Sequence, residues 1–323
     1  MLRQLTRNRP LRRVLAALAT LFGVAVVVFI MLRAIPGDQI TAGLGTEAAA
    51  LTPAQRAALE AYYGLDQPLI VQFFTWLGNV LTGNLGYSSR SQESVLALTA
   101  ASLPVTLELA VLSIALALVI GVPLGLLAAS KPDAPRDGFA QTVGLAGLSI
   151  PAFLLATSLL TLMSASFGFN PNGEAYAYFF QDPWLNLQQM LLPSIVLGFG
   201  IAAPIMRTTR TAVLEVRSND FIRTARAKGV PPRRLQVKHV LRNALLPIVT
   251  MTGLQFGYLL GGAVVVEQIF SLPGIGRQVL LGIQQKEYAL VQSTVLIIAL
   301  LFVLVNLLTD ALYRIIDPRV RAA

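Results

Sequence analysis

Six uncharged, apolar stretches alternate with polar segments along this chain, and each is long enough to cross a membrane as a helix. A span needs about 20 apolar residues, because the hydrocarbon core of a bilayer is about 30 Å thick. A helix satisfies its own backbone hydrogen bonds there. The first stretch is too long for a removable signal peptide. The pattern predicts an all-α integral membrane protein with six transmembrane helices, within residues 14–32, 109–130, 139–166, 184–206, 243–266 and 289–309.

The polar segment between the first two stretches, residues 36–102, carries two shorter helical patterns. In LTPAQRAALEAYYG, Thr52 is suited to cap a helix start, Pro53 to occupy its first position and Gly64 to follow its end. In QPLIVQFFTWLGNVLTG, apolar residues recur at helical spacing over a length too short for a span. This second helix is predicted to lie along the membrane surface or to pack on the spans. A covering role and a docking role both remain open.

The composition agrees with a membrane protein and excludes other classes. Of the 323 residues, 55% are hydrophobic and 13% are charged, and the mean hydropathy is +0.66, above that of ordinary soluble domains. The chain has no cysteine, which excludes disulfides. It has one histidine, and neither a metal-ligand spacing, a Ser-His-Asp set nor paired carboxylates occurs. We therefore predict no catalytic residue and no metal site.

Lysine and arginine are distributed unevenly about the six stretches. Of 25 cations, 20 fall within residues 1–13, 131–136, 207–242 and 314–321, which share one side of the membrane. Because cytoplasmic loops retain cations, both termini are predicted to be cytoplasmic. Residues 207–242 hold ten cations against two acids, so the net charge of +9 lies mostly in one loop and does not indicate a nucleic-acid partner.

This basic loop contains the stretch NDFIRTARAKGVPPRRLQVKHVLRNALLPIV, residues 219–249. Residues 218–220 (Ser-Asn-Asp) offer caps for a helix start. Gly229 suits the left-handed position after a helix end, and the two prolines that follow at 231 and 232 prevent continuation. The loop is predicted to hold a short helix, a stop and then a second helix.

The short helix presents a small apolar face with a cationic rim. Phe221, Ala225 and Gly229 recur every four residues, and Arg223 and Arg226 are among the cations beside them. Such a face suits close docking into a groove with acidic edges on another protein. A helix lying on anionic lipid is the alternative. Ala225 and Gly229 offer little apolar area for insertion into lipid, which favours docking.

Other candidate residues lie within the apolar stretches. GLQFGYLLG is a double GxxxG pattern, and its glycines Gly253, Gly257 and Gly261 are predicted to be helix-packing positions. Ionisable residues are almost absent from the centres of the stretches, which disfavours an ion-coupled secondary carrier. Polarity and helix kinks give three candidates for lining a translocation path: Ser149, Pro151 and Gln255.

TARAKG followed by RNALLP resembles the cytoplasmic loop of ATP-binding-cassette importer permeases, in the dipeptide/oligopeptide/nickel branch. Of the general loop pattern Glu-Ala-Ala-x-x-x-Gly, only Ala225 and Gly229 match, whereas RTARAKG resembles the form of this branch. The resemblance to the first of its two permease subunits extends over nearly the whole chain. It rests on AIPGD, GLDQPLIVQFFTWL, GNLGYS, LPVTLELA, GVPLGLLAA, SIPAF, VVVEQIFSLPGIG and NLLTDALYRIIDPRVR, in this order. Departures occur at Asn84, Glu287 and Ala289.

The resemblance implies a type I importer permease fold and a role for the short helix in coupling to an ATPase. The coupling residues would be Phe221, Ile222, Arg223, Thr224, Ala225, Arg226, Ala227, Lys228 and Gly229. The expected organisation is 1–35 as the N-terminus and first span, 36–102 as an extracytoplasmic segment, 103–317 as a five-helix core with the coupling loop 207–245, and 318–323 as a tail.

The implied partners are a second homologous permease, one or two cytoplasmic ATPase subunits and an extracytoplasmic substrate-binding protein in a bacterial or archaeal inner membrane. No GxxxxGK[ST] phosphate loop occurs, so no cofactor is expected in this chain, and ATP and Mg²⁺ would bind the ATPase subunits. The substrate, a dipeptide, oligopeptide, nickel chelate or other solute, is left open. An ion-coupled secondary carrier and an export permease are the alternatives.

Overall fold

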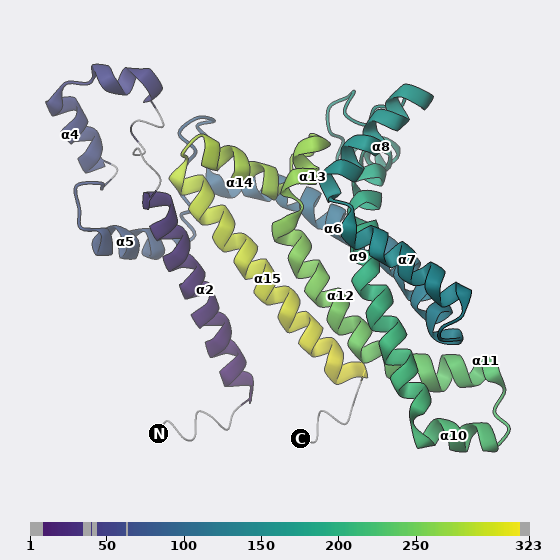
Figure 1. Ribbon diagram of the computed structural model, residues 1–323. Coiled ribbons are helices and arrows are strands. Elements are labelled where there is room, and N and C mark those ends of the chain that lie inside the picture. The colour runs from purple at the N-terminus through teal and green to yellow at the C-terminus, as the bar shows by residue number, and fades with distance from the viewer. Residues whose placement is uncertain (1–8, 35–39, 41–43, 63, 317–323) are drawn as a thin grey trace. The chain divides into compact units, whose positions relative to one another are not determined.

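The computed structural model describes residues 9–34, 40, 44–62 and 64–316 (Figure 1). These residues form helices with one isolated β-bridge, between Tyr87 and Ser94. They belong to two compact units, residues 1–104 with 277–303 and residues 105–276 with 304–323. Residues 277–303 thus group with the N-terminal part of the chain. The predicted tail 318–323, most of the AIPGD motif and the terminal cations Arg3, Arg7, Arg319 and Arg321 lie outside the described residues.

Among the described residues, five helices are long and apolar enough to span a membrane, and a sixth span is present if one bent pair is counted as one. The five include α2 (Arg9–Ala34), α6 (Val95–Ser130) and α9 (Pro183–Ser218). The fourth begins in α11 (Pro232–Arg234) and continues into α12 (Arg242–Gly262). The fifth lies within α15 (Tyr288–Ile316). Four of these helices contain a stretch predicted from the sequence. The predicted stretch 243–266 instead extends past the end of α12 at Gly262 into α13 (Val264–Ile269). The all-α, multi-span fold is confirmed.

The predicted span 139–166 is a broken pair rather than one continuous helix. It consists of α7 (Pro135–Ser149) and α8 (Ala152–Phe167), bent by 96°. The break falls at Pro151, because a proline disfavours the helical conformation of the residue before it. Ile150 accordingly has the extended values φ −83° and ψ 117°. The sequence marked Pro151 as a kink within this predicted span, and the structure gives the size of the bend there.

In the first unit, α4 (Pro53–Tyr62) is capped as predicted. Thr52 Oγ1 accepts from the Gln55 backbone N–H at 3.3 Å, and Gln55 Oε1 accepts from the Thr52 backbone N–H at 2.9 Å. This reciprocal pair is a capping box. Gly64 follows the helix with φ +66°, the left-handed conformation expected of it.

Helix α5 (Leu69–Leu81) packs on the first span, α2. Phe73 is buried, and its ring centroid lies 5.2 Å from that of Phe29 in an edge-to-face arrangement. Trp76 extends the same cluster. Leu69 and Phe74, which border this contact, remain exposed. Of the two predicted placements, packing on a span is therefore confirmed.

A buried carboxylate fixes the loop before α6 within the same unit. Glu287 is 5% exposed and accepts hydrogen bonds from Ser88 Oγ at 3.0 Å and from the Arg90 backbone N–H at 3.1 Å. Near it, Ser293 donates to the Leu85 carbonyl. Glu287 is one of the positions at which the sequence departs from the resembled family, and its carboxylate here has a structural role.

The second unit is built around α9, which packs against α6, α7, α8 and α12. Asp182 caps the start of α9 by accepting from the backbone N–H groups of Trp184 and Leu185. Close crossing of α6 and α9 depends on glycines. A Cβ added at Gly121 or Gly125 would lie 2.6 Å from a carbonyl oxygen of α9. These glycines belong to GVPLG, a GxxxG pattern that sequence analysis used only as a family motif.

Two carboxylates of the second unit accept hydrogen bonds, and of these Glu267 is buried and Glu108 is half-buried. Glu267, on α13 (Val264–Ile269), accepts from Thr106 Oγ1 at 2.6 Å. Glu108 accepts from Tyr176 Oη and Asn186 Nδ2, both at 3.3 Å. Tyr176 lies in the loop between α8 and α9, and burial and the Glu108 carboxylate raise its pKa. Its hydroxyl therefore stays protonated and donates at neutral pH.

Candidate functional site

The candidate site is the basic loop between α9 and α12, which folds as the predicted helix, stop and second helix. Helix α10 (Asp220–Ala227) and α11 lie together beyond the end of α9 (Figure 1). Only Asn219 separates α9 from α10, and its extended backbone, φ −70° and ψ 146°, turns the chain. The loop is therefore a compact extension of α9 and of the segment that leads into α12.

The start of α10 lies where the sequence predicted it, but without a side-chain cap. Asn219 occupies the cap position and makes no capping hydrogen bond to α10. Instead, Ser218 Oγ and Asn219 Nδ2 both donate to the Glu215 carbonyl, at 2.7 and 3.2 Å. These bonds satisfy the last turn of α9. The carboxylate of Asp220 in the first turn of α10 complements the positive end of the helix dipole.

The end of α10 is a Schellman motif. The backbone N–H of Gly229 donates to the Arg226 carbonyl at 3.0 Å, and that of Val230 donates to the Ala225 carbonyl at 3.2 Å. Gly229 has φ +77°, which L side chains adopt only with strain. The predicted left-handed glycine is confirmed. Pro231 and Pro232 follow it and end the helix.

The side chains of α10 fall into an anchored set and an exposed set. Ile222 is 1% exposed and belongs to a cluster with Val213, Leu235 and Val240. Ala225 is half-buried against the same cluster. A Cβ added at Gly229 would meet open space. The exposed positions are Phe221, Arg223, Thr224, Arg226, Ala227, Lys228 and Gly229.

This arrangement gives Ile222 a different environment from its neighbours in the predicted coupling set. Phe221 is 46% exposed, whereas the side chain of Ile222 is enclosed by the chain itself. Ile222 therefore holds α10 against α9 and the segment after Pro232. Phe221 and the cations offer the outward surface.

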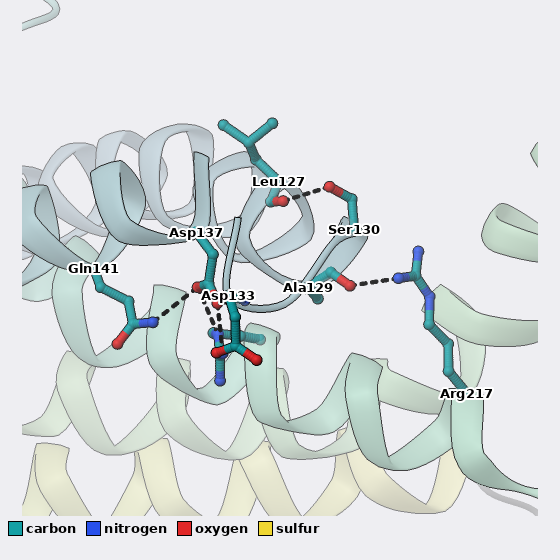
Figure 2. Close-up of polar contacts among 8 residues, drawn as sticks. Leu127, Ala129, Ser130, Asp133, Asp137, Gln141 and Arg217 are labelled. Carbon is teal, nitrogen blue, oxygen red and sulfur yellow. Dashed lines mark hydrogen bonds and ion pairs between the residues drawn. The ribbon is translucent and has the colours of Figure 1, made fainter. Parts of the chain in front are cut away.

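Arg217, in the last turn of α9, connects three segments of the loop region. Its guanidinium donates to the Ala129 carbonyl at the end of α6, as Figure 2 shows, and to Gln236 Oε1 at 2.6 Å. Gln236 belongs to a π-helix, η2 (Leu235–Leu241), which continues directly into α12. π-Helices are rare and are concentrated at functional sites. Sequence analysis did not identify this link.

A buried ion pair joins α7 to α9 on the same side of the unit. Arg210 Nε and Nη2 donate to the two carboxylate oxygens of Asp137 at 2.9 and 2.7 Å. Asp137 is 1% exposed and also accepts from Gln141 Nε2, a contact visible in Figure 2, and from the Asp133 backbone N–H. The pair is thus bidentate and fully supported by hydrogen bonds, the arrangement that makes a buried ion pair tolerable.

The three predicted packing glycines have different surroundings. A Cβ at Gly253 would clash with Thr309 of α15, and Gly257 is buried. Gly261 is exposed, and a Cβ there would meet nothing within 4 Å. Close packing of α12 on α15 therefore requires glycine at position 253, whereas position 261 has room for a side chain.

The three candidate path residues lie on two separate elements. Ser149 ends α7 and Pro151 precedes α8, both exposed at the 96° break. Gln255 lies in the middle of α12, half-buried, with its amide 3.6 Å from Met251 Sδ. Their role in a path stays a prediction.

Comparison with known proteins identifies the family. Residues 121–322 match the model of the binding-protein-dependent transport system inner membrane component, and residues 1–110 match its N-terminal companion. The chain belongs to this transport family. It is the permease subunit of an ATP-binding-cassette importer and a multi-pass protein of the inner membrane, as the resemblance implied. Members of this family act with a partner permease, ATPase subunits and a substrate-binding protein. The alternative of an ion-coupled secondary carrier is not favoured.

Curated relatives match over nearly their full length. The chain is 39% identical over 314 residues to the glutathione transport system permease protein GsiC of Escherichia coli O6:H1, covering 97% of this permease and 99% of that protein. It is 40% identical over 315 residues to the GsiC of Pectobacterium atrosepticum, with the same coverage. The comparisons thus place the chain among transport permeases.

Solved structures support the fold. The structure described as an inward facing conformation of the MetNI methionine ABC transporter matches with a TM-score of 0.54 at 20% identity. It covers 68% of this permease and 96% of the matched chain. At this identity the likeness concerns the fold alone, and it agrees with the predicted type I importer permease fold.

Proposed function

We propose that this permease, with a second homologous permease, forms the translocation path for di- or oligopeptides or similar small solutes that a substrate-binding protein delivers. The relatives that support this proposal are named glutathione transport permeases, and glutathione is itself a tripeptide. This chain supplies no catalytic step. One or two separate ATPase subunits bind ATP and Mg²⁺ and supply the energy.

The observation that carries the proposal is the division of α10 into an anchored and an exposed set. Buried Ile222 fixes the helix to the rest of the unit, whereas Phe221, Arg223 and Arg226 are free to contact another protein. The open space at Gly229 allows a partner to approach the backbone. An exposed cationic surface with a small apolar centre fits a groove with acidic edges. We assign α10 as the helix that contacts the ATPase subunit.

Movement of α10 by the ATPase subunits reaches the spans through short connections. Asn219 is the only residue between α10 and α9, and Arg217 joins α9 to the end of α6 and to η2. For a nearly complete switch between the inward-open and outward-open states, ATP must bind one state more tightly than the other by about 5.5 kcal/mol. Rigid anchoring of α10 keeps that energy from being lost in local motion.

The basic loop lies in the cytoplasm in this proposal, together with both termini. The support is the concentration of cations in residues 207–242, ten against two acids. The segment 36–102 then lies outside the cell, where a substrate-binding protein is available.

The test is affinity purification of the tagged permease from detergent-solubilised native membranes, with mass spectrometry of the bound chains. Wild type is expected to bring down a second permease and an ATPase. Gly229→Asp is expected to lose the ATPase but keep the second permease, because a side chain and a negative charge enter the contact. The matched control is Gly168→Asp, since Gly168 also has positive φ, +63°, and open space at its Cβ.

Retention of the ATPase by Gly229→Asp at normal expression would contradict the assignment of α10. Substrate class is tested separately, by competing uptake of labelled glutathione with unlabelled dipeptides and oligopeptides. Uptake that survives ATP depletion and collapses with the ion gradient would instead identify an ion-coupled secondary carrier.

A further inference from the structure

Two cavities in the first unit meet at one arginine, Arg33. The first, of about 490 Å³, has mixed walls that include the polar groups of Arg33, Gln72, Trp76, Asn79 and Gln292, and it is called the polar cavity below. The second, also of about 490 Å³, is an apolar groove between α2 and α5, lined by Val26, Phe29, Ile30, Arg33, Ala34, Leu69, Ile70, Phe73 and Phe74. A cation at the junction of a polar cavity and an apolar groove matches a ligand with an anionic head and an apolar tail.

Among the described residues that line the two cavities, no carboxylate pairs with the guanidinium of Arg33. Its Nε and Nη2 donate to Gln72 Oε1 at 3.2 and 2.9 Å, and its guanidinium lies 3.4 Å from the centroid of the Phe29 ring. The amide and the ring orient the guanidinium, and neither neutralises it. No aspartate or glutamate is among the described residues that line the two cavities.

Two residues that line the polar cavity each carry an enclosed donor atom that lacks an acceptor among the described residues. These atoms are Nε1 of Trp76 and Nε2 of Gln292. Gln292 is only 4% exposed. A buried donor without a partner is costly, so native proteins rarely leave one unpaired. A ligand rich in oxygen acceptors would satisfy both donors beside the Arg33 cation.

We propose that an anionic phospholipid occupies both cavities. Its phosphate binds Arg33, other oxygens of its head group accept from Trp76 and Gln292, and one acyl chain follows the groove between α2 and α5. A lipid fits better than a soluble anion, because only a lipid fills the apolar groove on a helix that spans the membrane. Tryptophan at the membrane interface is a feature of lipid contact.

The test uses the chain's own tryptophans as reporters. The permease has two, and replacing exposed Trp184 by Phe leaves Trp76, which lines the polar cavity. The full chain is reconstituted in phosphatidylcholine vesicles with increasing fractions of phosphatidylglycerol carrying brominated acyl chains, which quench tryptophan on contact. Brominated phosphatidylcholine is the reference lipid. Saturable quenching is expected at about fivefold lower mole fraction of the anionic lipid, the preference that one cation confers.

Variants assign that preference to Arg33. Arg33→Gln is expected to abolish it, whereas Arg33→Lys retains the charge and a preference. Arg90→Gln, at an exposed arginine of the same unit, is the matched control and is expected to leave it unchanged. Equal quenching by both lipids in the wild-type background, or an undiminished preference in Arg33→Gln, overturns the proposal. Soluble sn-glycerol 1-phosphate distinguishes the source of the phosphate: no effect is expected, and relief of quenching would identify a soluble anion instead.

Discussion

Arg210 of α9 holds both carboxylate oxygens of Asp137 of α7, with N–O distances of 2.9 and 2.7 Å. The two residues are 73 positions apart in the chain and join the broken α7–α8 pair to the central helix of the second unit. Because the carboxylate is buried, neither partner can be lost without leaving a charge in a poorly solvated place.

Removing one partner of this pair is expected to destabilise the permease strongly. Asp137→Asn leaves Arg210 without its counter-charge and removes the bidentate contact, so the thermal unfolding midpoint should fall. The measurement is the thermal unfolding midpoint of purified permease in detergent. Arg56→Gln is the control, because the Arg56–Glu60 pair is exposed and such pairs contribute about 0–1 kcal/mol. Equal midpoints for the two variants would contradict the structural role of the Asp137–Arg210 pair.

Ile222 and Phe221 are expected to respond differently to truncation, although they are adjacent. Ile222→Ala removes a buried side chain and should destabilise the chain by about 2–5 kcal/mol. Phe221→Ala removes an exposed ring, so it should leave the unfolding midpoint of the isolated permease unchanged and weaken retention of the ATPase. Unfolding in detergent and co-purification are measured for both variants. If Phe221→Ala lowered the unfolding midpoint and kept ATPase binding, Phe221 would be an anchoring residue and not a contact for the ATPase.

Gly229→Asp is expected to abolish transport without preventing membrane insertion. Backbone strain alone does not explain such a loss, since a non-glycine residue at positive φ costs only about 1–3 kcal/mol. Gly229→Ala separates the two effects, because it carries the strain without the charge and should retain part of the uptake. Uptake is measured in cells and normalised to the amount of permease in the membrane. Normal uptake by Gly229→Asp would remove the basis for placing a partner at this position.

The glycines of α12 are expected to differ when replaced by leucine. Gly253→Leu should lower the unfolding midpoint of the permease alone, because its Cβ meets Thr309. Gly261→Leu should not, because the space around it is open. Gly257 is buried, so Gly257→Leu is expected to distort the bundle or to weaken assembly with the second permease. Midpoint and yield of the complex are compared across the three variants, and an unaffected Gly253→Leu would show that α12 and α15 are not in close contact.

The link through Arg217 predicts a loss of coupling without a loss of assembly. Arg217→Ala removes the hydrogen bonds to the Ala129 carbonyl and to Gln236. The ATPase should still bind, because the exposed surface of α10 is unchanged, but hydrolysis should no longer depend on the loaded binding protein. Gln236→Ala removes one of the two bonds and should give a smaller effect. Hydrolysis is measured in proteoliposomes with and without binding protein.

The sequence by itself determined the features that depend on local spacing. The apolar lengths located the spans, Thr52 and Gln55 lie within one helical turn and form the predicted cap, and Gly229 adopts the left-handed conformation that ends α10. The family also followed from the order of short motifs, and the match to the importer permeases agrees with it. In each case the interacting groups are a few residues apart, so backbone geometry fixes their relation.

Only the tertiary structure decided the relations between segments distant in the chain. Asp137 meets Arg210, Arg217 meets Ala129, and Ile222 is enclosed, because α6, α7 and α9 pack in one particular register that no local pattern encodes. Sequence named Pro151 as a kink but not the 96° bend, and it treated Gly253 and Gly261 alike. Burial depends on which neighbour faces each side chain, and that is settled by the packing of whole helices.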